Sequence, residues 1–96
     1  MASKDTYRSN NGKYLFDFVF EKRNGYYDVH IAQQPSYGIR KKDLHSTHRL
    51  LSDFPECRYR ICFANPQDVP TLEKARKYAE AWAEATVNYI DRGERF

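Results

Sequence analysis

Basic residues that can contact anions gather in the middle of the sequence. Arg40, Lys41 and Lys42 form the densest basic run in the chain. Lysine and arginine bind phosphate through charge-assisted hydrogen bonds, and a neighbouring ring such as Tyr37 offers a face on which a base can stack. These residue types predict a surface that binds nucleic acid. The residues assigned to it are Arg40, Lys41, Lys42, Arg49, Arg58, Arg60 and Tyr37.

The charge balance places this basic excess before the C-terminal segment. The chain has 96 residues and a net charge of +3. Residues 1–65 contain eleven Lys and Arg against seven Asp and Glu, whereas residues 66–96 contain five against six. A positive excess attracts phosphate to the part of the chain that carries it. We therefore predict DNA or RNA as the partner.

A second group of polar residues falls on one face of the predicted strands. Its members are Asp17, Glu21, Asp28 and His30. Carboxylates and an imidazole could hold a divalent cation or transfer protons. However, we expect Arg58 and Arg60 on the same face, where a guanidinium takes the place of a metal ion. The pattern predicts an ion-pair network and no metal site.

Two histidines and two cysteines invite a zinc interpretation. Four ligands must surround one ion at a little over 2 Å, and here they would be His45, His48, Cys57 and Cys62. The cysteines lie five positions apart on one predicted strand, so their side chains point to opposite faces about 16 Å apart. They can neither share an ion nor form a disulfide. We predict reduced thiols.

The sequence offers no setting that would activate a nucleophile. Ser46 and Ser52 lie near histidines, but neither lies in a nucleophile elbow or a glycine-rich loop. We therefore predict that the protein is not an enzyme and needs no cofactor.

The segment 71–92 has the clearest periodicity in the chain. Small and apolar residues recur at helical spacing, which predicts an amphipathic helix with one dry face. Three alanines on this face allow close approach to a flat partner, and Trp82 fills the remaining space. The residues of the face are Leu72, Ala75, Ala79, Trp82, Ala83, Thr86, Tyr89 and Ile90. We expect this helix to pack on a sheet.

Asn24 and Gly25 predict a tight β-hairpin within residues 13–32. Both residues tolerate the positive φ of a type I′ turn. A two-residue turn at this position fixes the register of the two strands and places their apolar residues on one face. The predicted cross-strand pairs are Phe20 with Val29, Phe18 with Ile31, Phe16 with Gln33 and Glu21 with Asp28. The apolar face should contact the helix.

The other segments complete the predicted fold. Residues 1–12 are polar and predict a mobile lead-in. Residues 33–56 break both periodicities and predict a long basic loop, with a turn of helix within 47–53. Residues 57–64 alternate again and predict a third strand. Residues 13–96 should form a single α+β domain, a three-stranded antiparallel sheet with one C-terminal amphipathic helix on one face.

The outer face of this sheet suggests a competing function. It leaves apolar area uncovered, and such a patch marks a site for a protein partner or a second copy of the chain. The residues of this predicted interface are Leu15, Val19, Tyr26 and His30. The hypothesis fails if the lead-in or the middle loop folds over the face.

The order of hairpin, third strand and helix is similar to that of known small DNA-binding modules. With a helix that opens TLEKARKYAEAW, residues 13–92 resemble modules of three strands and one helix, such as the arm-binding domains of phage-type integrases. The resemblance implies the same element order and a role in DNA binding. The long middle loop departs from the compact turns of those modules.

The sequence shows no membrane or export signal. No apolar run approaches the roughly 20 residues of a membrane span, and MASKDTYRSN lacks the apolar core of a signal peptide. We expect a soluble cytoplasmic protein.

Overall fold

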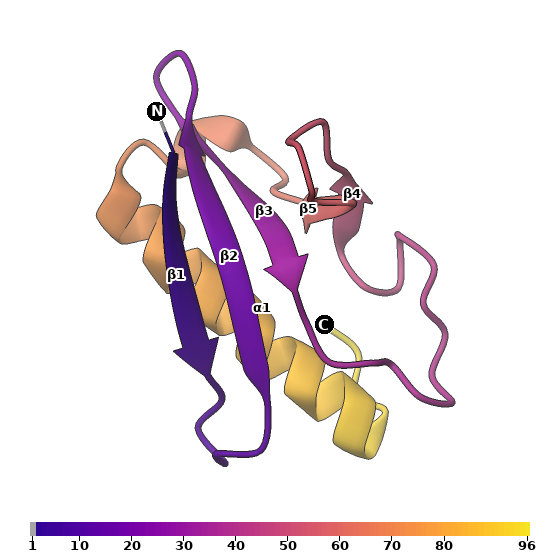
Figure 1. Cartoon of the computed structure of the whole chain (residues 1–96). Helices are drawn as coiled ribbons and strands as arrows, with labels where there is room; N and C mark the ends of the chain where they lie inside the picture. The colour runs from indigo at the N-terminus through magenta and orange to yellow at the C-terminus, as the bar shows by residue number, and fades with distance from the viewer. Residues whose placement is uncertain (1) are drawn as a thin grey trace.

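An antiparallel sheet lies against one long helix in the computed structural model, which describes residues 2–96 (Figure 1). The sheet order is β1-β2-β3-β5-β4. The strands are β1 (Ala2–Arg8), β2 (Leu15–Lys22), β3 (Tyr27–Gln33), β4 (Arg49–Leu51) and β5 (Tyr59–Ile61). A 3₁₀ helix, η1 (Pro66–Asp68), precedes α1 (Leu72–Arg92). The predicted α+β class and C-terminal helix are confirmed. The predicted number of strands, three, is wrong, because the sheet has five.

The two additional strands come from segments without a strand pattern. Residues assigned to the lead-in form β1, which pairs with β2 along its whole length. Two contacts hold β1 to the helix: Tyr7 Oη donates to Glu84 Oε2 at 2.5 Å, and Arg76 Nε donates to Asp5 Oδ2 at 2.7 Å. The segment expected to form a helical turn instead forms β4, which pairs with β5.

The predicted hairpin register is correct over most of its length. Phe18 pairs with Ile31, Phe20 with Val29 and Glu21 with Asp28. An irregularity between Asp17 and Phe18 shifts the pairing, so that Asp17 replaces Phe16 opposite Gln33. A β-bulge of this kind moves the strand by one residue and bends it.

The turn of the hairpin differs from the predicted type. Arg23 N donates to Tyr26 O at 2.7 Å, which closes a two-residue turn. Gly25 has a φ of 85°, whereas Asn24 has no positive φ. A type I′ turn requires positive φ at both central residues, so the turn is not of that type.

The aromatic side of the sheet packs on α1. Trp82 meets two buried rings edge-on, with centroids 6.0 Å from Phe16 and 6.1 Å from Phe18. The indole Nε1 donates to Thr47 O at 3.1 Å, which ties the helix to the middle loop. Close packing is possible because three helix residues are alanines with at most 1% exposure, namely Ala75, Ala79 and Ala83.

Both ends of α1 are capped. Thr71 Oγ1 accepts a hydrogen bond from Lys74 N at 3.2 Å. Gly93 ends the helix with a left-handed φ of 73°, which glycine adopts without steric cost. Among residues 2–96, no helix combines the length and apolarity that a membrane crossing needs.

Replacing Trp82 tests the core. Trp82→Ala should lower the free energy of unfolding by about 3 to 5 kcal/mol, because a large buried ring is replaced by a cavity. Urea denaturation measures the change. Lys77→Ala, on the exposed face of α1, should change the stability by less than about 0.5 kcal/mol. Equal stability of the two variants would contradict the assignment of Trp82 to the core.

Alkaline pH should weaken the attachment of β1. Burial and the hydrogen bond to Glu84 raise the pKa of Tyr7 to about 12 from 10.0. The stabilisation that the protonated Tyr7 hydroxyl gives the folded state is therefore fully present below pH 10.0, and it is lost as the pH rises through about 12. The difference in unfolding free energy between the parent and Tyr7→Phe should shrink over this range. Tyr26→Phe, at the turn, controls for the substitution, and a constant difference would contradict the account.

Candidate nucleic-acid interface

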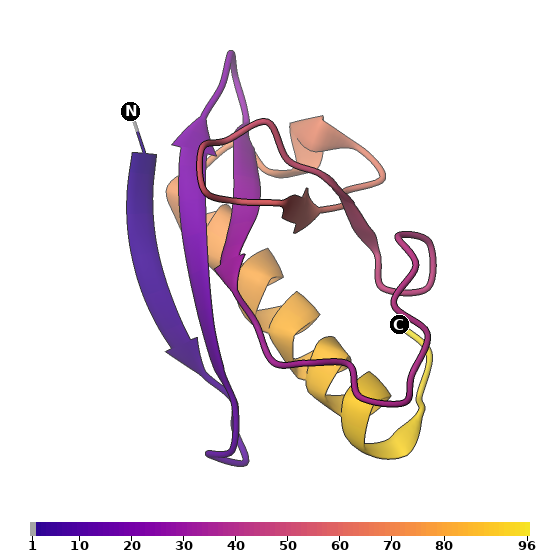
Figure 2. The same ribbon diagram turned by 45° about the vertical axis from the view of Figure 1, so that its right-hand side comes forward.

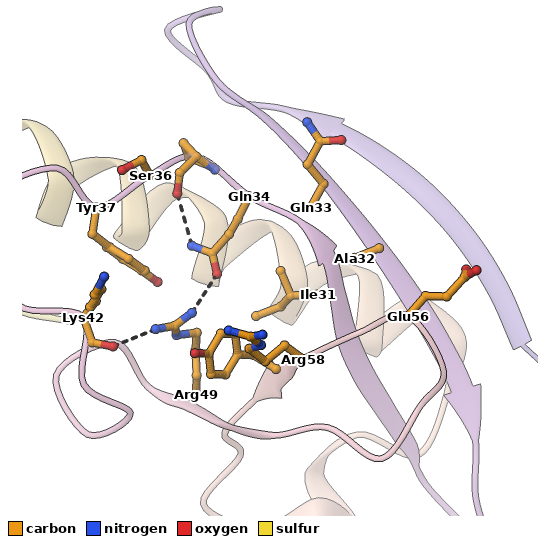
Figure 3. Close-up of a pocket in the computed structure, with 12 residues that line it drawn as sticks. Ile31, Ala32, Gln33, Gln34, Ser36, Tyr37, Lys42, Arg49, Glu56 and Arg58 are labelled. Atoms are coloured by element: carbon orange, nitrogen blue, oxygen red, sulfur yellow. Dashed lines mark hydrogen bonds between the residues drawn. The ribbon is translucent and has the colours of Figure 1, made fainter.

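Four of the predicted nucleic-acid residues line one cavity of about 350 Å³. The cavity lies where β3 ends, between the loop that follows β3 and the segment that leads into β5 (Figure 3). We call it the basic pocket. Its polar and charged side chains are those of Gln33, Gln34, Ser36, Tyr37, Lys42, Arg49, Glu56, Arg58 and Tyr59.

Arg49 forms a buried wall of this pocket. Its side chain hydrogen-bonds to three groups of the protein: Thr47 Oγ1 at 2.8 Å, Gln34 Oε1 at 3.1 Å and Lys42 O at 2.8 Å. The residue is 4% exposed, and its guanidinium lies 3.9 Å from the centre of the Tyr59 ring. We expected a phosphate contact here, but Arg49 instead holds the loop together.

The charge of Arg49 is not cancelled by an acid. Within residues 2–96, none of the ion pairs includes Arg49, and its hydrogen-bond partners are a hydroxyl, an amide and a carbonyl. A buried charge without a counter-charge projects a strong field, because little water screens it. The pocket wall therefore remains positive.

Tyr37 is a buried residue of the pocket lining. The residue is 7% exposed, and within the described chain its Oη has no hydrogen-bond partner. Figure 3 shows the hydroxyl directed toward Gln34 and Arg49. Burial raises the pKa of Tyr37, against the opposing influence of Gln34, Arg49 and Thr47. The buried ring is not the stacking surface that we expected, and its hydroxyl oxygen is buried with it.

Lys42 and Arg58 supply the exposed charges of the pocket. Both residues are exposed to solvent, and both contribute to the lining. Glu56 is the acidic lining residue, so basic side chains outnumber acidic ones. Long basic side chains at a rim can adjust to an anion while Arg49 stays fixed.

The other predicted basic residues lie elsewhere. Arg40 packs against the C-terminal end of α1, where its Nε donates to Ile90 O at 3.2 Å. Lys41 is exposed and lines a different cavity. Arg60 lies on the outer face of the sheet, with Nη1 3.7 Å from Asp28 Oδ1. These three residues do not line the basic pocket.

The predicted ion-pair network is present in part, with Arg23 at its centre. Among residues 2–96, Asp17 belongs to none of the ion pairs and instead accepts a hydrogen bond from Thr6 Oγ1 at 2.6 Å. Arg23 contacts Glu21 at 3.1 Å, Asp28 at 2.9 Å and Asp53 at 3.0 Å. The hydrogen bond from Arg23 lowers the pKa of Asp53. Arg58, which we expected in this network, lines the basic pocket instead. Glu21, Asp28 and His30 have ligand atoms close enough together to hold a metal ion, but the guanidinium of Arg23 already contacts both acids.

His30 fastens the middle loop to the outer face of the sheet. Its Nε2 lies 2.8 Å from Glu21 Oε1, and its Nδ1 lies 2.7 Å from Ser52 Oγ. Ser52 Oγ also accepts a hydrogen bond from Phe54 N at 3.0 Å. The Phe54 ring stacks on the imidazole at 4.9 Å. Because His30 is fully buried, these contacts hold the loop in place.

This loop removes most of the predicted protein interface. Val19 is 8% exposed and His30 is 0% exposed. Tyr26 is half-buried at the turn, and Leu15 is 42% exposed near the opposite end of β2. The outer face therefore has no continuous apolar patch of these four residues. The alternative in which the middle loop covers the face is the one observed.

The structure also shows where the cysteines and one histidine of the zinc hypothesis lie. Cys57 is buried, Cys62 is exposed, and both are free thiols. They lie on either side of β5, which is shorter than the predicted strand. His48 is exposed and stacks on Phe96 at 4.9 Å.

The sequence analysis missed five polar or charged residues of the basic pocket, of which Gln34 and Glu56 are the most informative. Gln34 orients Arg49, and Glu56 lies in the lining with a left-handed φ of 69°. Neither residue stands out by type or spacing. Their roles depend on contacts between distant segments.

Comparisons with protein-family models, curated proteins and solved structures found no match. The resemblance to integrase modules therefore stays a prediction, and we argue function from the pocket.

Replacing Arg49 should destabilise the protein, because its side chain holds the middle loop together. Arg49→Ala should lower the free energy of unfolding by roughly 3 kcal/mol, because it leaves buried hydrogen-bond acceptors without a donor. Urea denaturation measures this change. Arg58→Ala removes the same charge from an exposed position and should cost less than about 0.5 kcal/mol. Similar stability of the two variants would contradict the role assigned to Arg49.

Proposed function

We propose that this protein binds nucleic acid and that the basic pocket takes up a phosphate group of the nucleic-acid backbone. The proposal rests most on the convergence of four side chains from separate segments on one cavity, namely Tyr37, Lys42, Arg49 and Arg58. Their donors and charges suit a phosphate oxygen. The pocket is larger than a phosphate needs, which leaves room for an attached sugar.

Each of these side chains has a distinct task in the proposal. Lys42 and Arg58 contact phosphate oxygens from the rim, where their exposure lets them adjust. Arg49 contributes fixed positive charge from the wall, and the Tyr37 ring packs 4.9 Å from its guanidinium. Such a preorganised wall lowers the cost of ordering the site when the anion arrives.

Charge on the outer face favours this pocket over the sheet as the contact surface. Asp17, Glu21 and Asp28 all belong to the outer side of β2 and β3. Arg23 and Arg60 pair with two of these acids, whereas neither Lys42 nor Arg58 takes part in any of the ion pairs among residues 2–96. The pocket therefore offers cations without a counter-charge, and we expect a strand of nucleic acid to approach this side of the molecule.

The edge of β1 offers the competing route, pairing with a second copy of the chain. β1 is at one end of the sheet order, so one side of it is open. Antiparallel self-pairing that keeps each face intact can centre on Lys4, Asp5 or Thr6. These registers place Lys4 opposite Lys4, Asp5 opposite Asp5, or Lys4 opposite Arg8 of the second copy. Like charges directly opposite are destabilising, which disfavours this dimer.

The salt dependence of binding tests the proposed function. The affinity of the parent for a labelled single strand should fall as salt rises, because each neutralised phosphate releases counterions. Lys42→Ala with Arg58→Ala should weaken binding and make the slope of log affinity against log salt shallower by about 1.4. Fluorescence anisotropy measures both quantities.

A double variant of equal charge provides the control. Lys74→Ala with Lys77→Ala removes two exposed lysines from the first turns of α1, away from the pocket. It should bind like the parent. Absence of binding by the parent at low salt, or equal losses in the two double variants, would refute the proposal.

A further inference from the structure

A second basic cavity, of about 430 Å³, lies on the other side of the Lys41–Lys42 pair. Lys42 lines the basic pocket, whereas Lys41 lines this second cavity. We call it the C-terminal pocket, because the end of the chain returns beside the loop that precedes β4 (Figure 2). Its lining residues are Lys41, His45, Ser46, His48, Tyr89, Gly93, Arg95 and Phe96.

The lining of the C-terminal pocket suits an anion with an attached ring. Lys41 and Arg95 are exposed cations, and none of the described side chains in the lining is a carboxylate. His48 and Phe96 stack at 4.9 Å with an angle of 16° between their planes. His48 is exposed, so its ring is accessible for a further aromatic group to stack.

The backbone keeps the pocket in place independently of these cations. Lys41 O accepts a hydrogen bond from Tyr89 Oη at 2.6 Å, which fixes the loop to α1 while the lysine side chain stays exposed. His48 N donates to His45 O at 3.3 Å, and His48 O accepts from Cys62 N at 2.9 Å. Substituting the Lys41 side chain therefore leaves the recorded backbone contacts intact.

We propose that the two pockets hold phosphates of one nucleic-acid single strand, with an unpaired base stacked on His48. This inference rests on the proposed function and adds the class of nucleic acid to it. Lys41 lines one pocket and the adjacent Lys42 lines the other. One strand that passes over these two residues can therefore reach both pockets. A base that stacks on a ring must be free of its partner strand, which selects a single strand over a duplex.

Binding to a single strand and to a duplex of the same sequence tests the inference. The parent should bind the single strand at least about tenfold more tightly. Lys41→Ala with Arg95→Ala should weaken single-strand binding and make the salt slope shallower by about 1.4, as expected for two lost phosphate contacts.

A ring-specific variant separates stacking from charge. His48 has a φ of 51°, and asparagine tolerates this conformation without offering a ring. His48→Asn should lower single-strand affinity about tenfold while leaving the duplex affinity unchanged. The control remains Lys74→Ala with Lys77→Ala, and thermal melting checks that each variant is folded.

The outcomes distinguish this inference from the proposed function. If Lys42→Ala with Arg58→Ala weakens binding while the Lys41, Arg95 and His48 variants bind like the parent, the basic pocket stands and the C-terminal pocket is refuted. Equal affinity of the parent for single strand and duplex would also overturn the inference. Failure of the parent to bind either form would refute both proposals.

Discussion

The buried guanidinium of Arg49 organises the middle of this chain. It joins three positions of the middle loop, Gln34, Lys42 and Thr47, and it packs on the Tyr59 ring. Burying a charge is costly unless its donors find partners, and here uncharged acceptors serve that purpose. The same interaction that orders the loop therefore leaves positive charge in the wall of a cavity. The fold of the loop and the proposed function therefore both depend on the Arg49 guanidinium.

The middle loop also decides which surfaces are available. Ser52 and Phe54 hold it over His30, which covers the centre of the outer sheet face. Arg23 and its acidic partners occupy the neighbouring part of that face. On the loop side, Lys41 and Lys42 line two different cavities and neither takes part in an ion pair among the described residues. On the proposed function, an anionic partner would therefore contact the loops.

Local rules were enough to predict part of this fold from the sequence. Helical spacing over residues 71–92 predicted α1, and alternation about the turn predicted that Phe18 and Ile31 face it. Such patterns depend on neighbours in the sequence. β1 and β4 were missed because β1 is polar and β4 is very short, so both depend on pairing with another strand. The Asn24 turn was assigned from propensity, which does not determine φ.

The site was predicted by residue type but not by arrangement. Seven residues were assigned to one basic surface, yet Arg60 pairs with an acid and Arg40 packs on a helix end.

Heteronuclear NMR of the protein titrated with a single-stranded oligonucleotide tests the central claim most directly. The account predicts shifts of the backbone amides in residues 34–49, 56–59 and 93–96, with little change in β1 and β2. Shifts concentrated on β1 and β2, or none at low salt, would contradict it.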